Sequence, residues 1–460
     1  MTEMDYSTLL REEEEEHRLN RVPLTALYEA LKQVKDGRKK RGCRYSLALL
    51  LTLLLLARLA GETDMRAAAQ WIRLRKDWII EHLHLTRATL PCAGTYGYAL
   101  ERIDAQELLE VVAGCLTRWE AAERCQNEPS RLADQGGQQE KQHVAVDGKT
   151  MRGTLGHESA SQPSVHVLSI YEVRTGLVLA QRSVAEKENE ISAVKELLTP
   201  VYVKDRVWTA DAMHTQKIAC QCIDQLGGKY LFFFKDNHPT AHEDLRLFFQ
   251  DPDADQSTWG FFSQTDKGHG RLTTRTVRTA TEMNDWFANE WTGIAQTFQV
   301  IRTVKRKQRK VIEQAEAEEQ TSPREQATQS QQQVPAKRTP KAKTPKKAKQ
   351  VTFVEETSQQ VVYGFSNLTP SEASPQAIAT FLRNHWAIEN RLHWRRDVTL
   401  HEDHSQVRSA GKPQVLAALN NIVLSLMDWL GVRNVPDHMR LFAAFPKLAL
   451  TLLLGPLTFE

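Results

Sequence analysis

The segment from residue 143 to residue 237 alternates short strand-like runs with helix-like runs, and this alternation most constrains the fold. The strand-like runs, rich in β-branched and aromatic residues, are HVAVDGK, SVHVLSIYEV, LVLAQRSVA, RVWTADA and YLFFFKDN. The helix-like runs are ISAVKELLTPV and TQKIACQCIDQLG. Together they predict an α/β domain with a mixed sheet flanked by helices. Further strand-like runs in 258–305 and 351–368 predict a β-rich addition to it.

The chain before residue 125 has helical periodicity almost throughout, which predicts a separate all-α region. Its most apolar stretch, LALLLTLLLLA from Leu47 to Ala57, spans 11 residues between Arg44 and Arg58. A membrane-spanning helix needs roughly 20 apolar residues. We therefore expect a buried helix of a bundle. The acidic start of the chain lacks the apolar core of a signal peptide, so we expect a soluble, cytoplasmic protein.

The net charge of the 460 residues is only +3, and its distribution is more informative than its value. Residues 305–350 hold 13 Lys and Arg against 5 Glu, a local balance of +8 that leaves −5 for the remainder. The Gln, Lys, Pro and Glu of 307–350 cannot bury enough apolar surface to fold, so we expect a disordered loop there. Six scattered cysteines argue against a disulfide scaffold and fit a reducing compartment.

Three acidic residues have positions suited to metal binding. Asp147 and Asp211 follow apolar strand runs, at the sheet edge where open α/β folds bind ligands, and Glu389 lies in a later helix-like segment. Clustered carboxylates can hold Mg²⁺ or Mn²⁺, and two such ions can assist phosphoryl transfer. Each residue also has an ordinary explanation: a turn former for Asp147, a helix cap for Asp211, and a surface ion pair for Glu389.

Polar and basic residues near these positions are candidates for phosphate contacts. At the same sheet edge these are Lys149, Arg152, Lys235, Asn237 and His238. We expect one long helix over 374–398, on which His385, Glu389, His393 and Arg396 share a face. The two histidines could equally pack beside Trp386 and Trp394.

Two further features of this segment have competing interpretations. Trp386 and Trp394 could stack on an unpaired base, although helix packing is the expected use of at least one. The HEDH sequence at 401–404 has its histidines three apart, whereas the zincin motif needs them four apart on one helix face. We therefore expect polar surface or DNA contact there, and we assign no role to Glu402 or Asp403.

Several long motifs, in the right order, resemble DDE-type insertion-sequence transposases of the H-repeat-associated branch. They are DGRKKRGCRYSLALLLTLLLLARLAGETDMRAAAQW, VAVDGKTMRGT, EKENEISAVKELL, WTADAMHTQKIACQCIDQLGGKYLFFFKDNHP and RNHWAIENRLHWRRDVTLHEDHSQVR. The resemblance covers nearly the whole chain. It implies a ribonuclease H-like fold, a Mg²⁺ cofactor (Mn²⁺ as a substitute) and the cutting and joining of double-stranded DNA. It gives the catalytic, metal-binding roles to Asp147, Asp211 and Glu389.

The chain departs from its relatives at a few positions near these residues. Many relatives have a Tyr-Arg-Glu-Lys signature around the glutamate. Here Leu382 and His385 lie seven and four residues before Glu389, and Arg396 stands where the lysine would be. Relatives of the branch also tend to have Asn-Gln where this chain has Asn237-His238. The three metal-binding residues are all present. We expect the contacts with the DNA strand next to the cut site to differ from those of the relatives. Besides Lys149–Arg152, the basic cluster Arg391–Arg396 is expected to contact DNA.

The resemblance also divides the chain. The expected parts are an acidic tail (1–21), a helical transposase-associated domain (22–126), a linker (127–142), a catalytic domain (143–430) with a β-rich insertion at about 251–370, and a helical C-terminal segment (431–460).

The leading functional hypothesis is a transposase that binds terminal inverted repeats and acts as a homodimer or larger assembly in the nucleoid. A non-catalytic DNA-binding remnant of a degenerate element, or a metal-dependent nuclease that cuts without joining, are the alternatives.

Overall fold

The computed structural model describes eight stretches of the chain. They are residues 27–127, 141–156, 164–184, 190–235, 237–268, 270–312, 350–409 and 411–455. The expected acidic tail and most of the expected linker lie outside these stretches. The chain forms two compact units, of which the second comprises Ser263–Thr276 and Val300–Val361 and the first all the rest.

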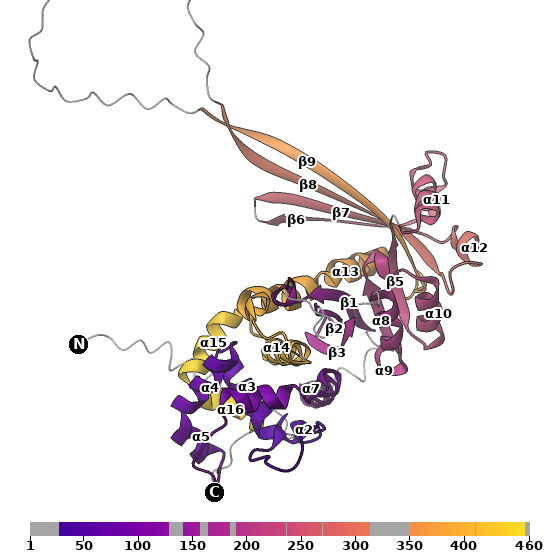
Figure 1. Cartoon of the computed structure of the whole chain (residues 1–460). Coiled ribbons are helices and arrows are strands. Elements are labelled where there is room, and N and C mark those ends of the chain that lie inside the picture. Colours follow the sequence, from indigo (N-terminus) through magenta and orange to yellow (C-terminus); the bar gives the residue numbers. More distant parts are fainter. Residues whose placement is uncertain are drawn as a thin grey trace, which may run out of the picture. The chain divides into compact units, whose positions relative to one another are not determined.

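The centre of the first unit is a mixed sheet with the strand order β3-β2-β1-β4-β5 (Figure 1). The strands are β1 (Gln142–Thr150), β2 (His166–Glu172), β3 (Leu177–Val184), β4 (Arg206–Ala210) and β5 (Lys229–Phe234). The first three are antiparallel neighbours, whereas β1–β4 and β4–β5 are parallel pairs. These directions and this order are those of a ribonuclease H-like sheet, which confirms the expected fold class.

The strands form where the sequence places runs of β-branched and aromatic residues, and those side chains fill the core. Val146, Ile170 and Leu231 are fully buried, as expected for strands covered on both faces. The helices that flank the sheet are α8 (Glu190–Leu197), α9 (Pro200–Val203), α10 (Lys217–Gln225), α11 (Pro239–Gln250) and α13 (Pro375–His385). Short 3₁₀ turns η1 (Arg152–Thr154) and η2 (Ala212–His214) follow β1 and β4.

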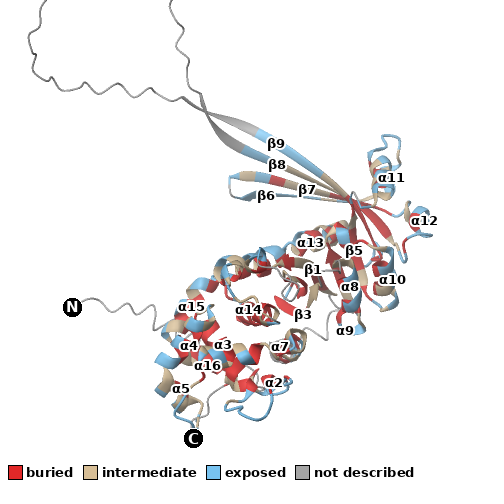
Figure 2. Cartoon of the chain, in the orientation of Figure 1, coloured by how far each residue is buried: buried red, intermediate tan, exposed pale blue. Residues whose placement is uncertain are grey.

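The N-terminal helices pack together with those at the C-terminal end, and with β3 (Figure 1). The N-terminal helices are α2 (Leu27–Leu31), α3 (Leu47–Leu59), α4 (Met65–Leu74), α5 (Lys76–His82), α6 (Ala93–Leu100) and α7 (Ala105–Asn127). The helices at the C-terminal end are α14 (Lys412–Trp429), α15 (Val435–Ala444) and α16 (Pro446–Leu454). Helix α3 begins where the Ser46 hydroxyl caps Leu49 N, and all its residues except Leu49 are buried, as expected (Figure 2). Within the described stretches, every helix is too short or too polar to cross a bilayer.

The β-rich insertion continues the sheet in the order β5-β9-β8-β7-β6. It comprises η3 (Gln256–Thr258), β6 (Gly260–Gly268), β7 (Arg271–Ala280), α12 (Asn284–Phe287), β8 (Gln296–Ile312) and β9 (Gln350–Ser366). In the second unit, the Thr265 and Thr274 hydroxyls lie 2.9 Å apart across β6 and β7, and most of β6 is exposed (Figure 2). Residues 313–349, the bulk of the expected basic loop, lie outside the described stretches.

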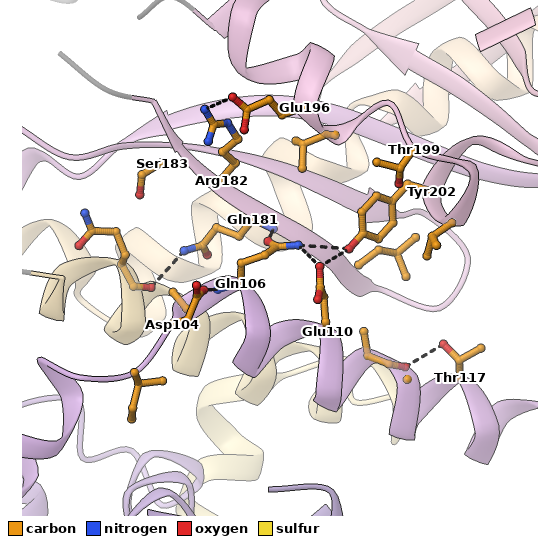
Figure 3. A pocket seen from close by; sticks show the side chains of 18 of the residues that line it. Asp104, Gln106, Glu110, Thr117, Gln181, Arg182, Ser183, Glu196, Thr199 and Tyr202 are labelled. Atoms are coloured by element: carbon orange, nitrogen blue, oxygen red, sulfur yellow. Dashed lines mark hydrogen bonds and ion pairs between the residues drawn. The ribbon is translucent and has the colours of Figure 1, made fainter. Parts of the chain in front are cut away.

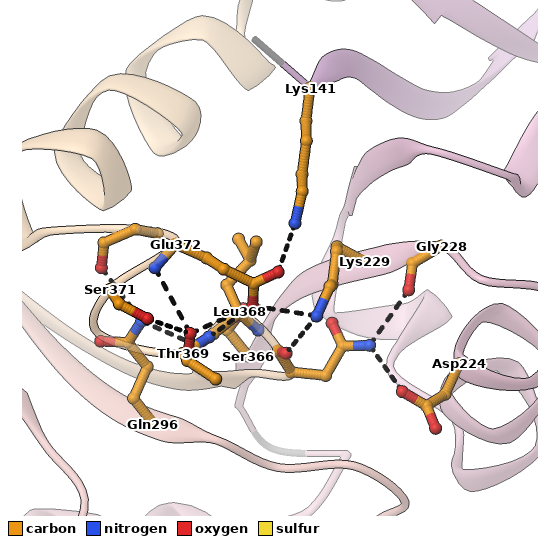
Figure 4. Close-up of polar contacts among 12 residues, drawn as sticks. Lys141, Asp224, Gly228, Lys229, Gln296, Ser366, Leu368, Thr369, Ser371 and Glu372 are labelled. Atoms are coloured by element: carbon orange, nitrogen blue, oxygen red, sulfur yellow. Dashed lines mark hydrogen bonds and ion pairs between the residues drawn. The ribbon is translucent and has the colours of Figure 1, made fainter. Parts of the chain in front are cut away.

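The chain returns from the insertion through polar contacts of Asn367 and of Glu372, the second of which Figure 4 shows. Asn367 accepts a hydrogen bond from Tyr230 N at 2.7 Å and donates to Asp224 Oδ1 at 2.9 Å. The Glu372 carboxylate accepts from Lys229 Nζ at 2.9 Å and Lys141 Nζ at 2.5 Å. These contacts fix the end of β9 against β5 just before α13 begins.

The prediction of one long helix over 374–398 is corrected, because the structure divides this stretch into three helical segments. Helix α13 is followed by π-helical segments η4 (Ile388–His393) and η5 (Arg395–Thr399), and then by a 3₁₀ turn, η6 (Glu402–His404). Leu400 N donates to Arg395 O at 2.9 Å, a bond to the fifth preceding residue. Wider turns of this kind are rare and occur often at functional sites. Glu389 lies in η4.

Candidate active site

Asp147 lies within β1, and Asp211 directly follows the neighbouring parallel strand β4. In the β1–β4 register Val146 is the partner of Ala210, and Asp147 and Asp211 come next along the chain. Adjacent strands lie about 4.8 Å apart, so the two residues meet at one edge of the sheet. The β-branched runs set this position because each ends at its aspartate.

Glu389 and His393 join Asp147 from the other side, out of η4. His393 Nδ1 lies 3.1 Å from Glu389 Oε2 and 3.3 Å from Asp147 Oδ2. One possible ligand atom from each of these three residues lies within 4.8 Å of the other two. Asp211 is not part of this tight group among the described residues; it directly follows Ala210, the β4 partner of Val146.

Hydrogen bonding and burial shift the proton affinities of the groups at this edge. Burial lowers the pKa of His393, but hydrogen bonds with Asp147 and Glu389 outweigh it and raise that pKa above its ordinary value. The bond with His393 lowers the pKa of Glu389, against the opposing effect of burial. Burial lowers the pKa of His385, although the charges of Asp211 and Asp147 oppose this. The net effect lowers the pKa of His385, which favours its neutral form.

The donor set fits a divalent cation. Carboxylate oxygens suit hard cations such as Mg²⁺ and Mn²⁺, and imidazole suits several transition metals. In the present arrangement His393 lies between two carboxylates that could otherwise repel each other. Asp147, Asp211 and Glu389 could hold such an ion at the sheet edge, with His393 as a neighbour or a further ligand.

The basic residues after β1 differ in exposure. Lys149 is buried, and its Nζ lies 2.6 Å from Asp397 Oδ2. Burial raises the pKa of Asp397, and the Lys149 ammonium opposes that shift. Arg152 has a side chain that is 77% exposed, 3.7 Å from an oxygen of Asp403. Of the two, only Arg152 presents its charge to solvent.

The residues after β5 fasten the segment that follows Asp211. Asn237 Nδ2 donates to Ala212 O at 2.5 Å, and His238 Nε2 lies 2.7 Å from Thr215 O. Thr215 Oγ1 in turn donates to Phe233 O at 2.8 Å. Lys235 is exposed. Asn237 and His238 therefore support the backbone of this segment, while Lys235 points its charge outward.

Of the four residues expected on one helix face, His385, His393 and Arg396 are buried, whereas the Glu389 side chain is 55% exposed. The neighbouring Trp386 and Trp394 are 57% and 54% exposed. Arg391 is half-buried and pairs with Asp428 at 3.2 Å. More than half of each indole is exposed, and Trp386 also contacts the ring of His385 at 5.7 Å between centroids.

Arg396 needs a correction, because its guanidinium is inaccessible to DNA. Its side chain is 0% exposed and pairs with the equally buried Glu402 at 2.6 Å. Asn420 donates to Glu402 Oε2 at 2.8 Å and accepts from Arg58 Nη1 at 2.5 Å. Burial lowers the pKa of Arg58 to about 10. This buried chain joins α3, α14 and η5, and Glu402 is therefore interior rather than polar surface.

Sequence reasoning missed Glu402 as a core ion-pair partner and the carboxylate of Glu190, which lies between His166 and His214. Both residues lie in segments that stand out in the sequence. Glu402 lies in the HEDH segment and Glu190 in the EKENEISAVKELL motif. Neither motif indicates a partner, because the partners come from distant segments.

A cavity of about 1050 Å³ lies between α7, β3 and the α8–α9 region (Figure 3). In its wall, Tyr202 Oη donates to Glu110 Oε1 at 2.8 Å and accepts from Gln106 Nε2 at 3.1 Å. None of the three acidic site residues lines it. The cavity is therefore separate from the carboxylate cluster.

The chain matches the family described as "Transposase DDE domain" over residues 138–426. The chain belongs to the DDE transposase family. Residues 28–119 of this DDE transposase also match the family "DDE_Tnp_1-associated", in agreement with the expected N-terminal helical domain.

Several relatives of this DDE transposase are known. "Putative protein YbfL" of Escherichia coli (strain K12) is 23% identical, over 88% of this chain and 91% of its own length. "H repeat-associated putative transposase YhhI" of the same strain is 25% identical, over 63% and 64%. An "Uncharacterized protein in dhlA 3'region" of Xanthobacter autotrophicus is 30% identical, over 54% and 79%. The H-repeat-associated resemblance is thereby confirmed.

Among solved structures, a piggyBac transposase synaptic complex with hairpin DNA aligns with a TM-score of 0.35 and 11% identity. The alignment covers 96% of this chain and 80% of that chain. A TM-score this low does not establish a common fold, so nothing about this DDE transposase follows from the match.

Proposed function

We propose that this DDE transposase cuts DNA at the ends of its own mobile element and joins the freed ends to a target. The observation that carries the proposal is the group of Asp147, Glu389 and His393, whose possible ligand atoms lie within 4.8 Å of one another, together with Asp211 at the end of the adjacent parallel strand. The family membership supports the use of a divalent metal. The carboxylates gathered at β1 offer the oxygen ligands that such a metal prefers.

Asp147, Asp211 and Glu389 are the proposed metal ligands. Bound Mg²⁺ or Mn²⁺ ions would activate water or a 3′-hydroxyl and stabilise the leaving oxygen of the phosphodiester. The chain's own residues orient these ligands. His393 holds Glu389 and Asp147 together, and the hydrogen bonds of Asn237 and His238 fix the backbone after Asp211.

The DNA contacts are proposed for the residues that are charged or aromatic and exposed around this edge. They are Arg152, Lys235, Trp386 and Trp394. Arg and Lys bind backbone phosphates, and an exposed indole can stack on an unpaired base. Lys149, His385 and Arg396 are turned to interior partners, so we leave them out of this interface. Because two element ends must be held together, we expect a homodimer or a larger assembly on DNA.

Replacing Asp211 by Asn tests the catalytic assignment. The neutral amide is a poor ligand for a hard cation, so strand cleavage is expected to fall at least about 100-fold. Binding to labelled element ends should be unchanged. The exposed Asp253→Asn, far along the chain from the site, is the matched control and should cut normally. Full cleavage by Asp211→Asn in Mg²⁺ would overturn the assignment.

A second assay distinguishes a transposase from a nuclease. Purified protein is given a pre-cut element end with a free 3′-hydroxyl and a supercoiled target plasmid. Joined product supports strand transfer, whereas cleavage without joining identifies a nuclease. A wild-type chain that binds element ends but neither cuts nor joins in Mg²⁺ or Mn²⁺ is a non-catalytic remnant.

A further inference from the structure

Glu190, the first described residue of α8, lies between two histidines from other parts of the chain. Its Oε1 is 2.6 Å from His166 Nε2 in β2, and its Oε2 is 3.0 Å from His214 Nε2 in η2. The side chains of Glu190 and His214 are 17% and 1% exposed. One carboxylate therefore links three separate elements.

This group lies directly against the backbone that carries Asp147. A Cβ built on Gly148 would come within 2.5 Å of His166 Nε2 and 2.7 Å of the Glu190 carboxyl group. Thr150 Oγ1 lies 2.8 Å from His166 Nδ1, which fixes the ring from its other nitrogen. Glycine at 148 is what allows the Glu190 carboxylate to approach the strand so closely.

His166 and Glu190 lie against the face of β1 opposite to Asp147. His166 pairs with Thr150 in the β1–β2 register. Side chains alternate along a strand, so Gly148 and Thr150 face one way and Asp147 the other. His214 comes three residues after Asp211, in the turn that leaves the end of β4. The same carboxylate thus touches the strand of Asp147 and the turn that follows Asp211.

The arrangement is a clamp rather than a metal site, because each histidine faces a different carboxylate oxygen. Burial raises the pKa of Glu190, but hydrogen bonds from His166 and His214 outweigh it and lower the pKa to about 2. The carboxylate is therefore charged at neutral pH, and one of its oxygens lies close to each ring. Outer contacts that hold metal ligands in place typically change metal affinity or activity about 10- to 100-fold when removed.

We propose that His166, Glu190 and His214 form a positioning clamp that holds the backbone of Asp147 and Asp211 at the separation needed to bind the divalent metal. This role rests on the proposed function, since it assumes that the two aspartates are ligands. Glu190 acts through the strand and the turn and does not touch the DNA or the metal.

Mn²⁺ binding to the full-length protein, followed by electron paramagnetic resonance, tests the clamp without any need for activity. Glu190→Ala is expected to raise the Kd for Mn²⁺ about 10-fold or more. Glu190→Gln keeps the side-chain shape and one acceptor oxygen, so it should show a smaller increase. Glu196→Ala is the matched control, because it lies on the same helix in an exposed pair with Arg182. Its Kd should stay within about twofold of wild type.

Thermal melting and binding to element ends are measured on every variant. Unchanged melting with weakened Mn²⁺ binding supports positioning, because a purely structural role would alter stability instead. If Glu190→Ala folds and binds Mn²⁺ with the wild-type Kd, the clamp is wrong. If Glu190→Ala does not fold, a wild-type Kd for Glu190→Gln leads to the same conclusion. If wild type and Asp147→Asn bind Mn²⁺ equally, the proposed metal site itself is wrong, and the clamp falls with it.

Discussion

His393 Nδ1 lies 3.3 Å from Asp147 Oδ2, which links the π-helical segment η4 to the first strand, β1. The same nitrogen lies 3.1 Å from Glu389 Oε2. Because a single buried ring contacts both carboxylates, the position of Glu389 relative to the sheet depends on it. The wide π-helical turns bring the ring inward while Trp394, the next residue, stays exposed.

Replacing His393 by Ala removes the group that holds Glu389 beside Asp147. We expect cleavage of element ends to fall about 10- to 100-fold, with a higher Mn²⁺ requirement. A metal titration of the cleavage rate measures both. His393→Gln, whose amide can still donate a hydrogen bond, should recover part of the loss. Equal rates for His393→Ala and wild type at all metal concentrations would contradict this role.

Trp386 and Trp394 are expected to contribute to DNA affinity rather than to stability. Their indoles are more than half exposed, so truncation to Ala removes little packing. Stacking on a base is worth about 1 to 3 kcal/mol, so each variant should bind element ends about 5- to 150-fold more weakly. Fluorescence anisotropy with a pre-cut end measures the change.

Trp286→Ala provides the control for the tryptophan variants. Trp286 is 67% exposed on α12 and donates to Asp244 at 3.0 Å. Its removal should leave DNA affinity unchanged. Equal weakening by all three substitutions would mean that the effect is not specific to the region around Glu389.

Glu402→Gln is expected to destabilise the protein strongly. Glu402 is the anionic partner of the fully buried Arg396, and its charge also favours the charged form of buried Arg58. Removing one member of a buried ion pair leaves an uncompensated charge and costs about 3 to 5 kcal/mol. Urea unfolding measures the loss. Glu196→Gln, at an exposed pair, should stay within about 0.5 kcal/mol of wild type, and a similar value for Glu402→Gln would refute the argument.

Glu372 should make the free energy of unfolding depend on pH in the acidic range. Burial raises its pKa, but hydrogen bonds from Lys141, Thr369 N and Lys229 lower it to about 2, from an ordinary 4.5. A carboxyl group whose pKa is lower in the folded than in the unfolded protein stabilises the fold fully at pH values above its unfolded pKa. For Glu372 this stabilisation is lost as the pH falls through about 2. Glu372→Gln should therefore reduce the free energy of unfolding by about 1 to 2 kcal/mol at pH 7.

The difference between wild type and Glu372→Gln should shrink steadily between pH 4.5 and pH 2. Urea unfolding of both proteins at pH 7, 4.5 and 3 measures it. Glu243→Gln, at an exposed pair with Arg246 on α11, serves as the control with little effect at any pH. A difference that is the same at pH 7 and pH 3 would show that the Glu372 charge is not what stabilises the fold.

Local patterns in the sequence were sufficient for the strands of the central sheet. The runs ending at Asp147 and Asp211 are apolar and β-branched, and the structure has β1 and β4 at those places. The α3 helix was equally predictable, because an apolar run too short for a membrane must be buried. Helix α11 was not predicted, although Pro239 in its first turn and the apolar residues Leu245 and Phe249 were signals for it.

The side-chain partners around the site were not predictable in the same way. An ideal helix over 374–398 places Arg396 on the face of Glu389, but the π-helical turns carry it inward to Glu402. Lys149 likewise has the sequence context of a phosphate ligand, yet Asp397 neutralises it in the interior. Both outcomes depend on contacts between segments far apart in the chain.

The sequence by itself determined the mixed sheet, the buried helix and the order of the three acidic motifs, because each depends on residues close together in the chain. Only the tertiary structure decided which charges face solvent. Arg152 and Arg396 are chemically alike, but one side chain is 77% exposed and the other 0%. The physical reason is that a buried charge is stable only beside a partner. For Arg396 that partner, Glu402, is brought near by the turns between them and held by Asn420 from α14.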